Sequence, residues 1–123
     1  MNIRKSSEDY LEQILMIREQ KGEVRSIDIA AGLNVTKPSV SVAMKRLREN
    51  GYIHMDKENY ITLSEKGEAI AAAIYARHKT LTRCLMLLGV EAETAREDAC
   101  KMEHDISDTS YQALVNYLEN RKD

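Results

Sequence analysis

Apolar residues recur every three or four positions over most of this chain, which is the spacing of an amphipathic helix. The first such segment is capped by Ser6 or Ser7, whose hydroxyl groups suit the start of a helix. It continues to Lys21, where Gly22 ends it. We therefore predict a long N-terminal helix.

Two shorter helices are predicted next. The first covers residues 27–31, with Ser26 as its cap and Gly32 as its end. The second is capped by Thr36 and continues to Glu49, and its single proline lies in the first turn, where a missing N–H costs nothing. Two helices joined by so short a turn are typical of a helix-turn-helix unit.

Two short segments with strand character follow this unit. Residues 52–55 and 60–63 flank a polar turn at residues 56–59, which is the pattern of a β-hairpin. The order of helix, short helix, turn, helix and hairpin is that of a winged helix-turn-helix. We assign this domain to residues 1–63.

The pattern after residue 63 is helical again. Ser64 opens a long alanine-rich helix that continues to Gly89, and two further helices are predicted at residues 91–104 and 108–119. The predicted fold class is therefore mainly α, with an N-terminal winged helix joined by a long helix to a helical C-terminal domain, residues 64–123.

The composition excludes several classes of protein. The 123 residues carry a net charge of −2, so the chain is not a uniformly basic nucleic-acid coat, although a local basic patch is still allowed. Its apolar stretches are shorter than the ~20 residues that cross a bilayer, and no signal peptide is evident, so we expect a cytoplasmic protein without a membrane partner. Two cysteines cannot form a disulfide framework. No nucleophilic triad or nucleotide-binding motif is present, and we expect no small organic substrate.

The predicted helix that ends at Glu49 concentrates positive charge, with four basic residues and no acidic residue between positions 37 and 48. Val40, Met44 and Leu47 form its buried stripe, so the opposite face is available to enter the major groove of DNA. The predicted DNA contacts are Thr36, Lys37, Pro38, Ser39, Ser41, Val42, Lys45, Arg46 and Arg48, with Lys57 at the hairpin tip. The alternative is an ordinary solvated basic face.

Two helical segments carry groups that suit a divalent transition metal. The first has carboxylates at positions i and i+3, and the second has a thiol, a carboxylate and an imidazole at i, i+3 and i+4, so each set lies on one side of its helix. The candidate ligands are Asp9 and Glu12, then Cys100, Glu103 and His104, with His78 on the long helix as a further imidazole.

Each set also has an ordinary explanation. Asp9 and Glu12 are equally expected as first-turn acids that the helix dipole favours. A cysteine on a helix is often a small core residue, and an adjacent glutamate and histidine can be a solvated pair. Cys84, within an apolar segment, is expected to lie in the core.

Five segments in register resemble the diphtheria-toxin-repressor family of metal-dependent transcriptional regulators, especially its short manganese-responsive branch. They are Ser7–Ile14, Pro38–Ser41, Ile61–Gly67, Arg77–His78 and Cys100–His104. The resemblance implies a homodimer whose C-terminal helical domain mediates dimerisation. It also implies that Mn²⁺ or Fe²⁺ binds between the two domains and that the protein then represses metal-uptake operons. The ligands it implies are Asp9, Glu12, His78, Cys100, Glu103 and His104.

The chain departs from both branches of that family. Manganese-responsive members have a glutamate in place of Cys100, whereas iron-responsive members have a methionine in place of Asp9 and a second-site glutamate in place of Thr82. Oxygen ligands suit Mn²⁺, whereas a thiolate favours Fe²⁺, Co²⁺ or Zn²⁺, and we expect the last two ions to bind in vitro. We expect Mn²⁺ or Fe²⁺ as the effector.

These observations favour a metal-dependent repressor that binds double-stranded operator DNA as a homodimer. The alternative is a winged-helix transcriptional regulator that needs no metal. A small metallohydrolase with Glu103 as general base is disfavoured because the chain has no H-E-x-x-H motif. We therefore expect that the protein is not an enzyme.

Overall fold

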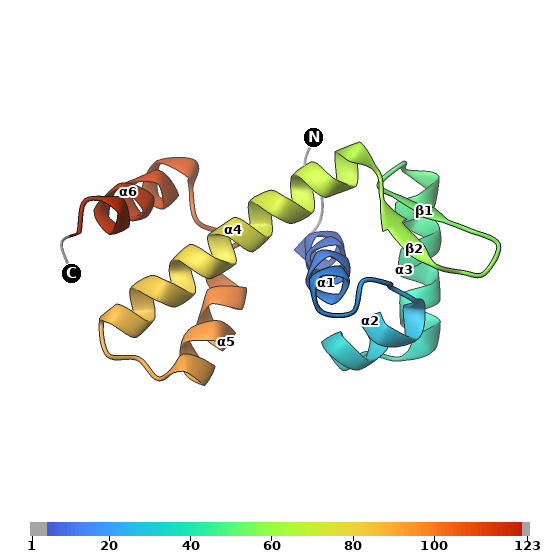
Figure 1. Ribbon diagram of the computed structural model, residues 1–123, viewed down its shortest axis with the longest axis horizontal. Coiled ribbons are helices and arrows are strands. Elements are labelled where there is room, and N and C mark those ends of the chain that lie inside the picture. Colours follow the sequence, from blue (N-terminus) through green and yellow to red (C-terminus); the bar gives the residue numbers. More distant parts are fainter. Residues whose placement is uncertain (1–4, 122–123) are drawn as a thin grey trace. The chain divides into compact units, whose positions relative to one another are not determined.

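The computed structural model describes residues 5–121, over which the chain forms six α-helices and one two-stranded sheet (Figure 1). In chain order these elements are α1 (Lys5–Lys21), α2 (Ser26–Leu33), α3 (Lys37–Glu49), β1 (Ile53–Met55), β2 (Ile61–Leu63), α4 (Glu65–Leu87), α5 (Ala92–Met102) and α6 (Asp108–Glu119). The chain divides into two compact units, and the boundary falls inside α4, between Ala72 and Ala73. The mainly helical architecture with one hairpin confirms the predicted fold class.

The core of the first unit is built from one apolar face of each of its first three helices. Leu11 of α1 and Ile29 of α2 are fully buried, as is Val40 of α3. Met44 and Leu47 continue the buried face of α3 at helical spacing, which confirms the predicted stripe. The opposite face of α3 is therefore directed to solvent.

The predicted hairpin is confirmed. Ile53 pairs with Leu63 in an antiparallel register, and the two strands have three residues each. The Asp56 carboxylate accepts the backbone N–H of Glu58 at 2.9 Å, and Asn59 adopts a left-handed conformation with φ of 67°. These local interactions close the turn.

The start of α3 follows the prediction. The Thr36 hydroxyl accepts the backbone N–H of Ser39 at 3.3 Å, which satisfies one of the donors at the helix start. Pro38 lies in the first turn, and the helix ends at Glu49 before Asn50.

The end of α1 at Lys21 confirms the prediction, whereas the predicted start of α1 and both predicted ends of α2 were wrong in detail. Ser6 and Ser7 lie inside the first turn of α1, which is already helical at Lys5, so neither is its cap. A side chain suited to capping does not by itself fix where a helix starts.

The cap of α2 is Arg25 instead of Ser26. The Asp28 carboxylate accepts the Arg25 backbone N–H at 3.0 Å. The helix start is therefore capped by an acid in the first turn and not by the predicted Ser26 hydroxyl. Gly32 lies within the helix, and Asn34 ends it in a left-handed conformation with φ of 54°.

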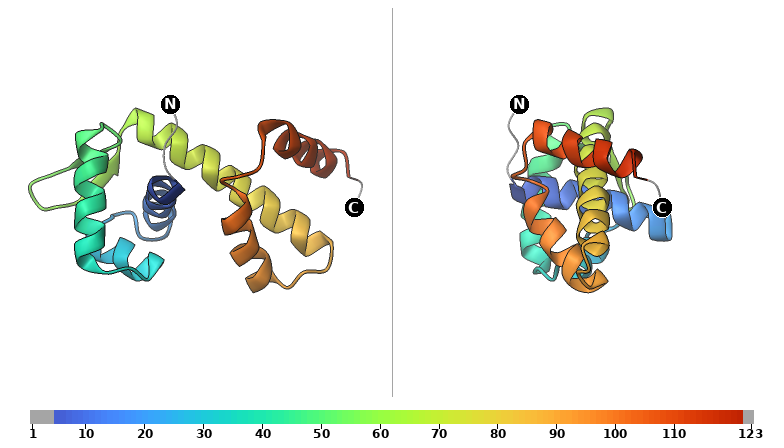
Figure 2. Two further views of the ribbon diagram at one scale, coloured as in Figure 1. Left: turned by 180° about the vertical axis from the view of Figure 1, so that it is seen from behind. Right: turned by 90° about the vertical axis from the view of Figure 1, so that its left-hand side faces the viewer.

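In the second unit, α5 and α6 flank the second half of α4 (Figure 2). Leu81 of α4 and Ala95 and Ala99 of α5 are buried. The bounds of α6 agree with the prediction. Cys84 is only half-buried, because the last turns of α4 are more exposed than a core helix, so the prediction that it lies in the core was wrong.

The helix α5 ends two residues earlier than predicted. Its last residue is Met102, Glu103 is its C-cap, and His104 lies in the following turn. Glu103 nevertheless keeps helical dihedrals, with φ of −62° and ψ of −25°, so its side chain continues the face of the helix. Over residues 5–121, no helix is long and apolar enough to cross a membrane.

A tight contact fixes the start of α4 on the first unit. The Ser64 hydroxyl accepts the Gly67 N–H at 3.0 Å and donates to the carbonyl of Gly51 at 2.6 Å. A Cβ on Gly67 would lie 2.0 Å from the carbonyl oxygen of Tyr52, so only glycine allows this approach.

We predict that Gly67→Ala lowers the free energy of unfolding by about 1–3 kcal/mol, because a backbone carbonyl must move to admit the methyl group. Gly32→Ala is the matched control, since its new methyl group meets only the flexible end of Gln13. It should change the free energy by less than about 0.5 kcal/mol. Urea unfolding of both variants measures the difference, and equal stabilities would contradict the role of Gly67.

Candidate metal centre and nucleic-acid interface

All ten residues predicted to contact DNA are exposed. Val42 on α3 is 55% exposed, which is unusual for a β-branched apolar side chain and follows from the burial of Val40 and Met44 on the other face. The hydroxyl group of Ser39 lies 2.8 Å from that of Thr36 at the start of the same helix. The exposed face of α3 therefore combines small polar, apolar and basic groups, and its contact with DNA stays a prediction.

The basic side chains of α3 are not neutralised by acids. Among residues 5–121, no carboxylate forms an ion pair with Lys37, Lys45, Arg46 or Arg48. The Arg48 guanidinium donates to the Met55 sulfur at 3.9 Å. These charges remain available for phosphate groups.

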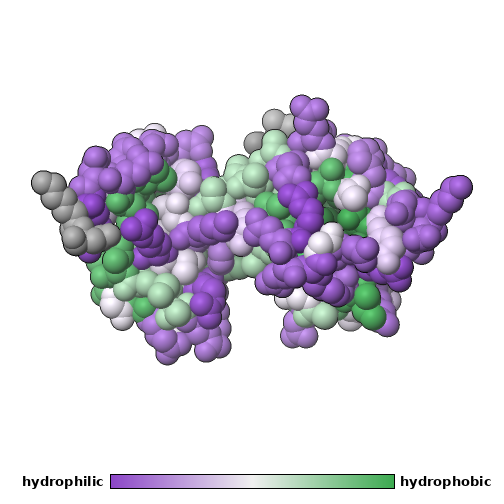
Figure 3. Space-filling view, in the orientation of Figure 1, coloured by the Kyte–Doolittle hydropathy of each residue, from purple (hydrophilic) through white to green (hydrophobic). Residues whose placement is uncertain are grey.

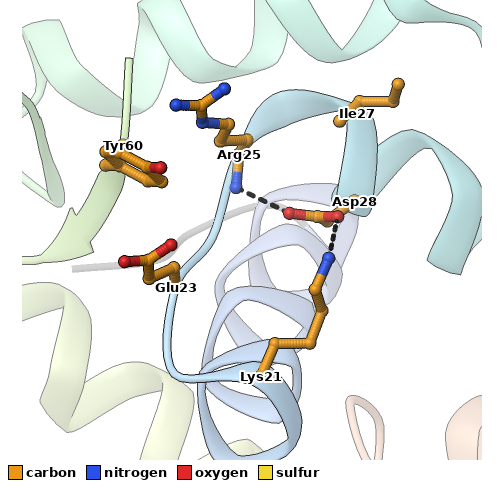
Figure 4. A pocket seen from close by; sticks show the side chains of 6 residues that line it. All are labelled: Lys21, Glu23, Arg25, Ile27, Asp28 and Tyr60. Atoms are coloured by element: carbon orange, nitrogen blue, oxygen red, sulfur yellow. Dashed lines mark hydrogen bonds and ion pairs between the residues drawn. The ribbon is translucent and has the colours of Figure 1, made fainter. Parts of the chain in front are cut away.

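A shallow pocket of about 300 Å³ lies between the start of α2 and the start of β2, and Figure 4 shows its lining residues Lys21, Glu23, Arg25, Ile27, Asp28 and Tyr60. The Lys21 ammonium lies 2.7 Å from the Asp28 carboxylate and lowers the pKa of that acid. The Arg25 guanidinium lies over the Tyr60 ring, 4.1 Å from its centroid. Two basic and two acidic side chains balance, so the pocket offers no net charge to a ligand.

The second unit brings together three metal-binding side chains from two helices. His78 of α4, Cys100 of α5 and Glu103 at the end of α5 each place one ligand atom so that all three atoms lie within 4.8 Å of one another. The Glu103 Oε2 atom lies 3.2 Å from His78 Nδ1. Its Oε1 atom lies 3.6 Å from Nε2 of His104. Three of the predicted ligands, His78, Cys100 and His104, thus lie around the carboxylate of a fourth, Glu103.

The burial of that carboxylate is the most informative feature of the cluster. Glu103 is 0% exposed, and within the described part of the chain neither of its oxygens accepts a hydrogen bond. Burying a carboxylate is costly unless hydrogen bonds or a cation compensate it. Imidazole, thiolate and carboxylate groups together form a donor set that suits a divalent transition metal. The residues present therefore fit a bound metal ion.

Asp9 and Glu12 belong to the first unit, on α1. Glu12 is buried at 3% exposure and Asp9 is half-buried, and the two lie three residues apart on the helix. Their role as metal ligands stays a prediction.

Two neighbours of the cluster, Tyr75 and Arg77, have no role predicted from the sequence. The Tyr75 ring stacks near His78, with centroids 6.4 Å apart and an angle of 23° between the planes. Arg77 donates to the backbone carbonyl of Glu103 at 3.4 Å. In the sequence, Arg77 stands out only as the neighbour of His78. That position does not predict its contact with the backbone of Glu103, which is 26 residues away.

Two family models cover most of the chain. Residues 2–60 match the N-terminal DNA binding domain of the iron dependent repressors. Residues 64–123 match their metal binding and dimerisation domain.

Relatives of similar length support the same assignment. An HTH-type transcriptional regulator of Methanocaldococcus jannaschii is 38% identical over 120 residues, which are 96% of each chain. The transcriptional regulator MntR of Salmonella typhimurium is 35% identical over 116 residues, covering 94% of this chain and 74% of that protein. The regulator MntR of Bacillus subtilis is 36% identical over 117 residues, covering 93% and 82%.

Solved structures share the fold. The manganese regulator SloR superposes with a TM-score of 0.81 at 30% identity, over 99% of this chain and 56% of that one. A manganese-dependent transcriptional repressor in complex with manganese gives a TM-score of 0.83 at 26% identity, over 94% and 53%. The chain therefore spans little more than half the length of these solved regulators.

The relatives are named as transcriptional regulators, which confirms the prediction of a regulator instead of an enzyme. The matched domains cover the exposed basic helix in the first unit and the cluster around Glu103 in the second. The chain belongs to the diphtheria-toxin-repressor family of metal-dependent transcriptional regulators, as its sequence motifs indicated.

Proposed function

We propose that this protein is a metal-dependent repressor that binds operator DNA as a homodimer when Mn²⁺ or Fe²⁺ occupies its metal centre. The observation that carries the proposal is the buried Glu103 carboxylate, which lies between two imidazoles and accepts no hydrogen bond from the described residues. A bound cation compensates such a group. The protein would act in the cytoplasm, where thiols stay reduced.

We propose the ligand set Asp9, Glu12, His78, Cys100, Glu103 and His104. Cys100 supplies a thiolate, which raises affinity for Fe²⁺ relative to Mn²⁺, whereas the carboxylates favour Mn²⁺. The matched family is named for iron and two similar solved structures are named for manganese, which supports either ion as the effector. Co²⁺ and Zn²⁺ are expected to bind in vitro.

We propose that α3 reads operator DNA from the major groove, with Lys57 of the hairpin on a neighbouring phosphate. In a symmetric dimer the two recognition helices meet half-sites about one helical turn apart, ~34 Å, or a multiple of it. The end of α4 supports a dimer, because Leu88 is 81% exposed and apolar residues gather there (Figure 3).

The proposed ligands come from both halves of the chain, so metal binding and DNA binding would be coupled. A coupling of about 1–3 kcal/mol changes operator affinity by roughly 5–150-fold, which is enough for a switch. The metal would act by offsetting repulsion among the acids and so favouring the DNA-binding arrangement.

The central test is Glu103→Gln, with Glu97→Gln on the exposed side of α5 as its control. We expect the parent and the control to bind a duplex, selected from genomic DNA in the presence of Mn²⁺, with an affinity that Mn²⁺ or Fe²⁺ raises roughly 5–150-fold. We expect the Glu103→Gln protein to lose this increase. Anaerobic titration with fluorescence anisotropy measures the affinity, and circular dichroism shows that each protein is folded.

An increase that persists in the Glu103→Gln protein would contradict the proposed metal centre. A parent protein that binds the duplex equally well with metal and with chelator would instead support a regulator that needs no metal.

The two cysteines should differ in their reaction with iodoacetamide. Burial raises the pKa of the Cys84 thiol, so at pH 8 less of it is thiolate and it should react slowly, whereas Cys100 is exposed. If Cys100 is a ligand, saturating Mn²⁺ or Co²⁺ should protect it and leave the rate at Cys84 unchanged. Mass spectrometry of the alkylated peptides measures both rates. If the rate at Cys100 is the same with and without metal, Cys100 is not a ligand.

Lys45→Gln should weaken binding to every duplex by a similar factor. Removing one phosphate contact should also reduce the slope of log affinity against log salt concentration by about 1. Arg83→Gln, an exposed change on α4, is the matched control and should leave the slope unchanged. An unchanged slope in the Lys45→Gln protein would remove this residue from the interface.

A further inference from the structure

Arg77 links α4 to the connection between α5 and α6. Its Nη1 atom donates to the carbonyl of Ile106 at 2.6 Å and to that of Glu103 at 3.4 Å. Its Nη2 atom pairs with the carboxylate of Asp108 in the first turn of α6. The side chain is only 16% exposed, so these contacts lie largely out of water.

These contacts stabilise the end of α5. The last turn of a helix leaves carbonyl groups without helical partners, and it carries a partial negative charge. The carbonyl of Glu103, the C-cap, belongs to that turn, and the carbonyl of Ile106 lies in the segment that follows. A guanidinium group suits this position, because its donors can bind the unpaired carbonyls and its positive charge offsets the partial negative charge of the helix end.

The position of Arg77 in the sequence connects these contacts to the metal centre. It is the neighbour of His78, so the same turn of α4 carries one ligand and holds the backbone of another. The carboxylate of Glu103 lies between His78 and His104, and any shift of the residue 103 backbone would change both distances.

We propose that Arg77 is a positioning residue of the metal centre, which holds Glu103 and His104 at the correct distance from His78 for a divalent ion. This inference rests on the proposed function. Residues that orient metal ligands without touching the ion typically contribute 10–100-fold to metal affinity.

The ion pair with Asp108 does not account for the role of Arg77. The Asp108 side chain is 95% exposed, and an ion pair with so exposed a partner contributes little to stability. Arg77 also lies over the Tyr111 ring of α6, 5.3 Å from its centroid, so the proposed role in the metal centre rests on the contacts with the two backbone carbonyls. Asp108→Asn removes the ion pair and keeps those contacts, so it separates the two roles.

The experiment uses the full chain with Mn²⁺ and, as a spectroscopic probe, Co²⁺. Arg77→Met should lower the affinity for both ions by about 10–100-fold and change the Co²⁺ absorption spectrum, because the ligands no longer hold their positions. Arg77→Lys should retain part of the affinity, since an ammonium group reaches fewer acceptors. Asp108→Asn and the matched control Arg96→Met, exposed on α5, should bind like the parent.

Calorimetric titration gives the affinities at a temperature where thermal unfolding shows every metal-free variant to be folded. If Arg77→Met does not fold, Arg77→Lys carries the test. Parent-like affinity and an unchanged spectrum in the folded variant would overturn the role of Arg77 and leave the proposed function intact. A parent that binds neither ion would overturn both.

Discussion

The carboxylate of Glu103 is the group on which the chemistry of the second unit depends. It is fully buried, so its charge must be compensated by neighbours instead of by water. Two imidazoles flank it, and Arg77 holds its backbone from a third direction. This uncompensated burial is the basis of the proposal that Glu103 is a metal ligand.

In the first unit, helix α3 buries an apolar stripe and leaves its basic side chains exposed. Val40, Met44 and Leu47 are withdrawn into the core, and their removal from the surface leaves α3 with an exposed face that carries unneutralised positive charge. An overall charge of −2 conceals this concentration, because α3 carries a single acid, Glu49, at its last residue, and the other acids lie elsewhere in the sequence. Each unit therefore has one feature on which the proposed function rests: a buried carboxylate that would bind a cation, and an exposed basic face that would bind phosphate groups.

The sequence was sufficient wherever a property repeats with the period of one element. Helical spacing predicted the buried stripe of α3, and the i, i+3 spacing of Cys100 and Glu103 predicted that they share a face. Prediction from the sequence failed where a structural feature depends on a single contact between two residues. The carboxylate cap on Arg25 and the reach of Arg77 to distant carbonyls have no periodic signature, so neither was foreseen.

The register of the β1–β2 hairpin determines where residues could be inserted without exposing its buried face. Ile53 and Ile61 face the core, whereas His54 and Thr62, paired with each other, face outward. Lengthening either strand by one residue would exchange those faces, but lengthening residues 56–59 would not. The distance to which Lys57 projects can thus vary without disturbing the interior, so the length of the tip is the property of this hairpin that can change with the least effect on stability.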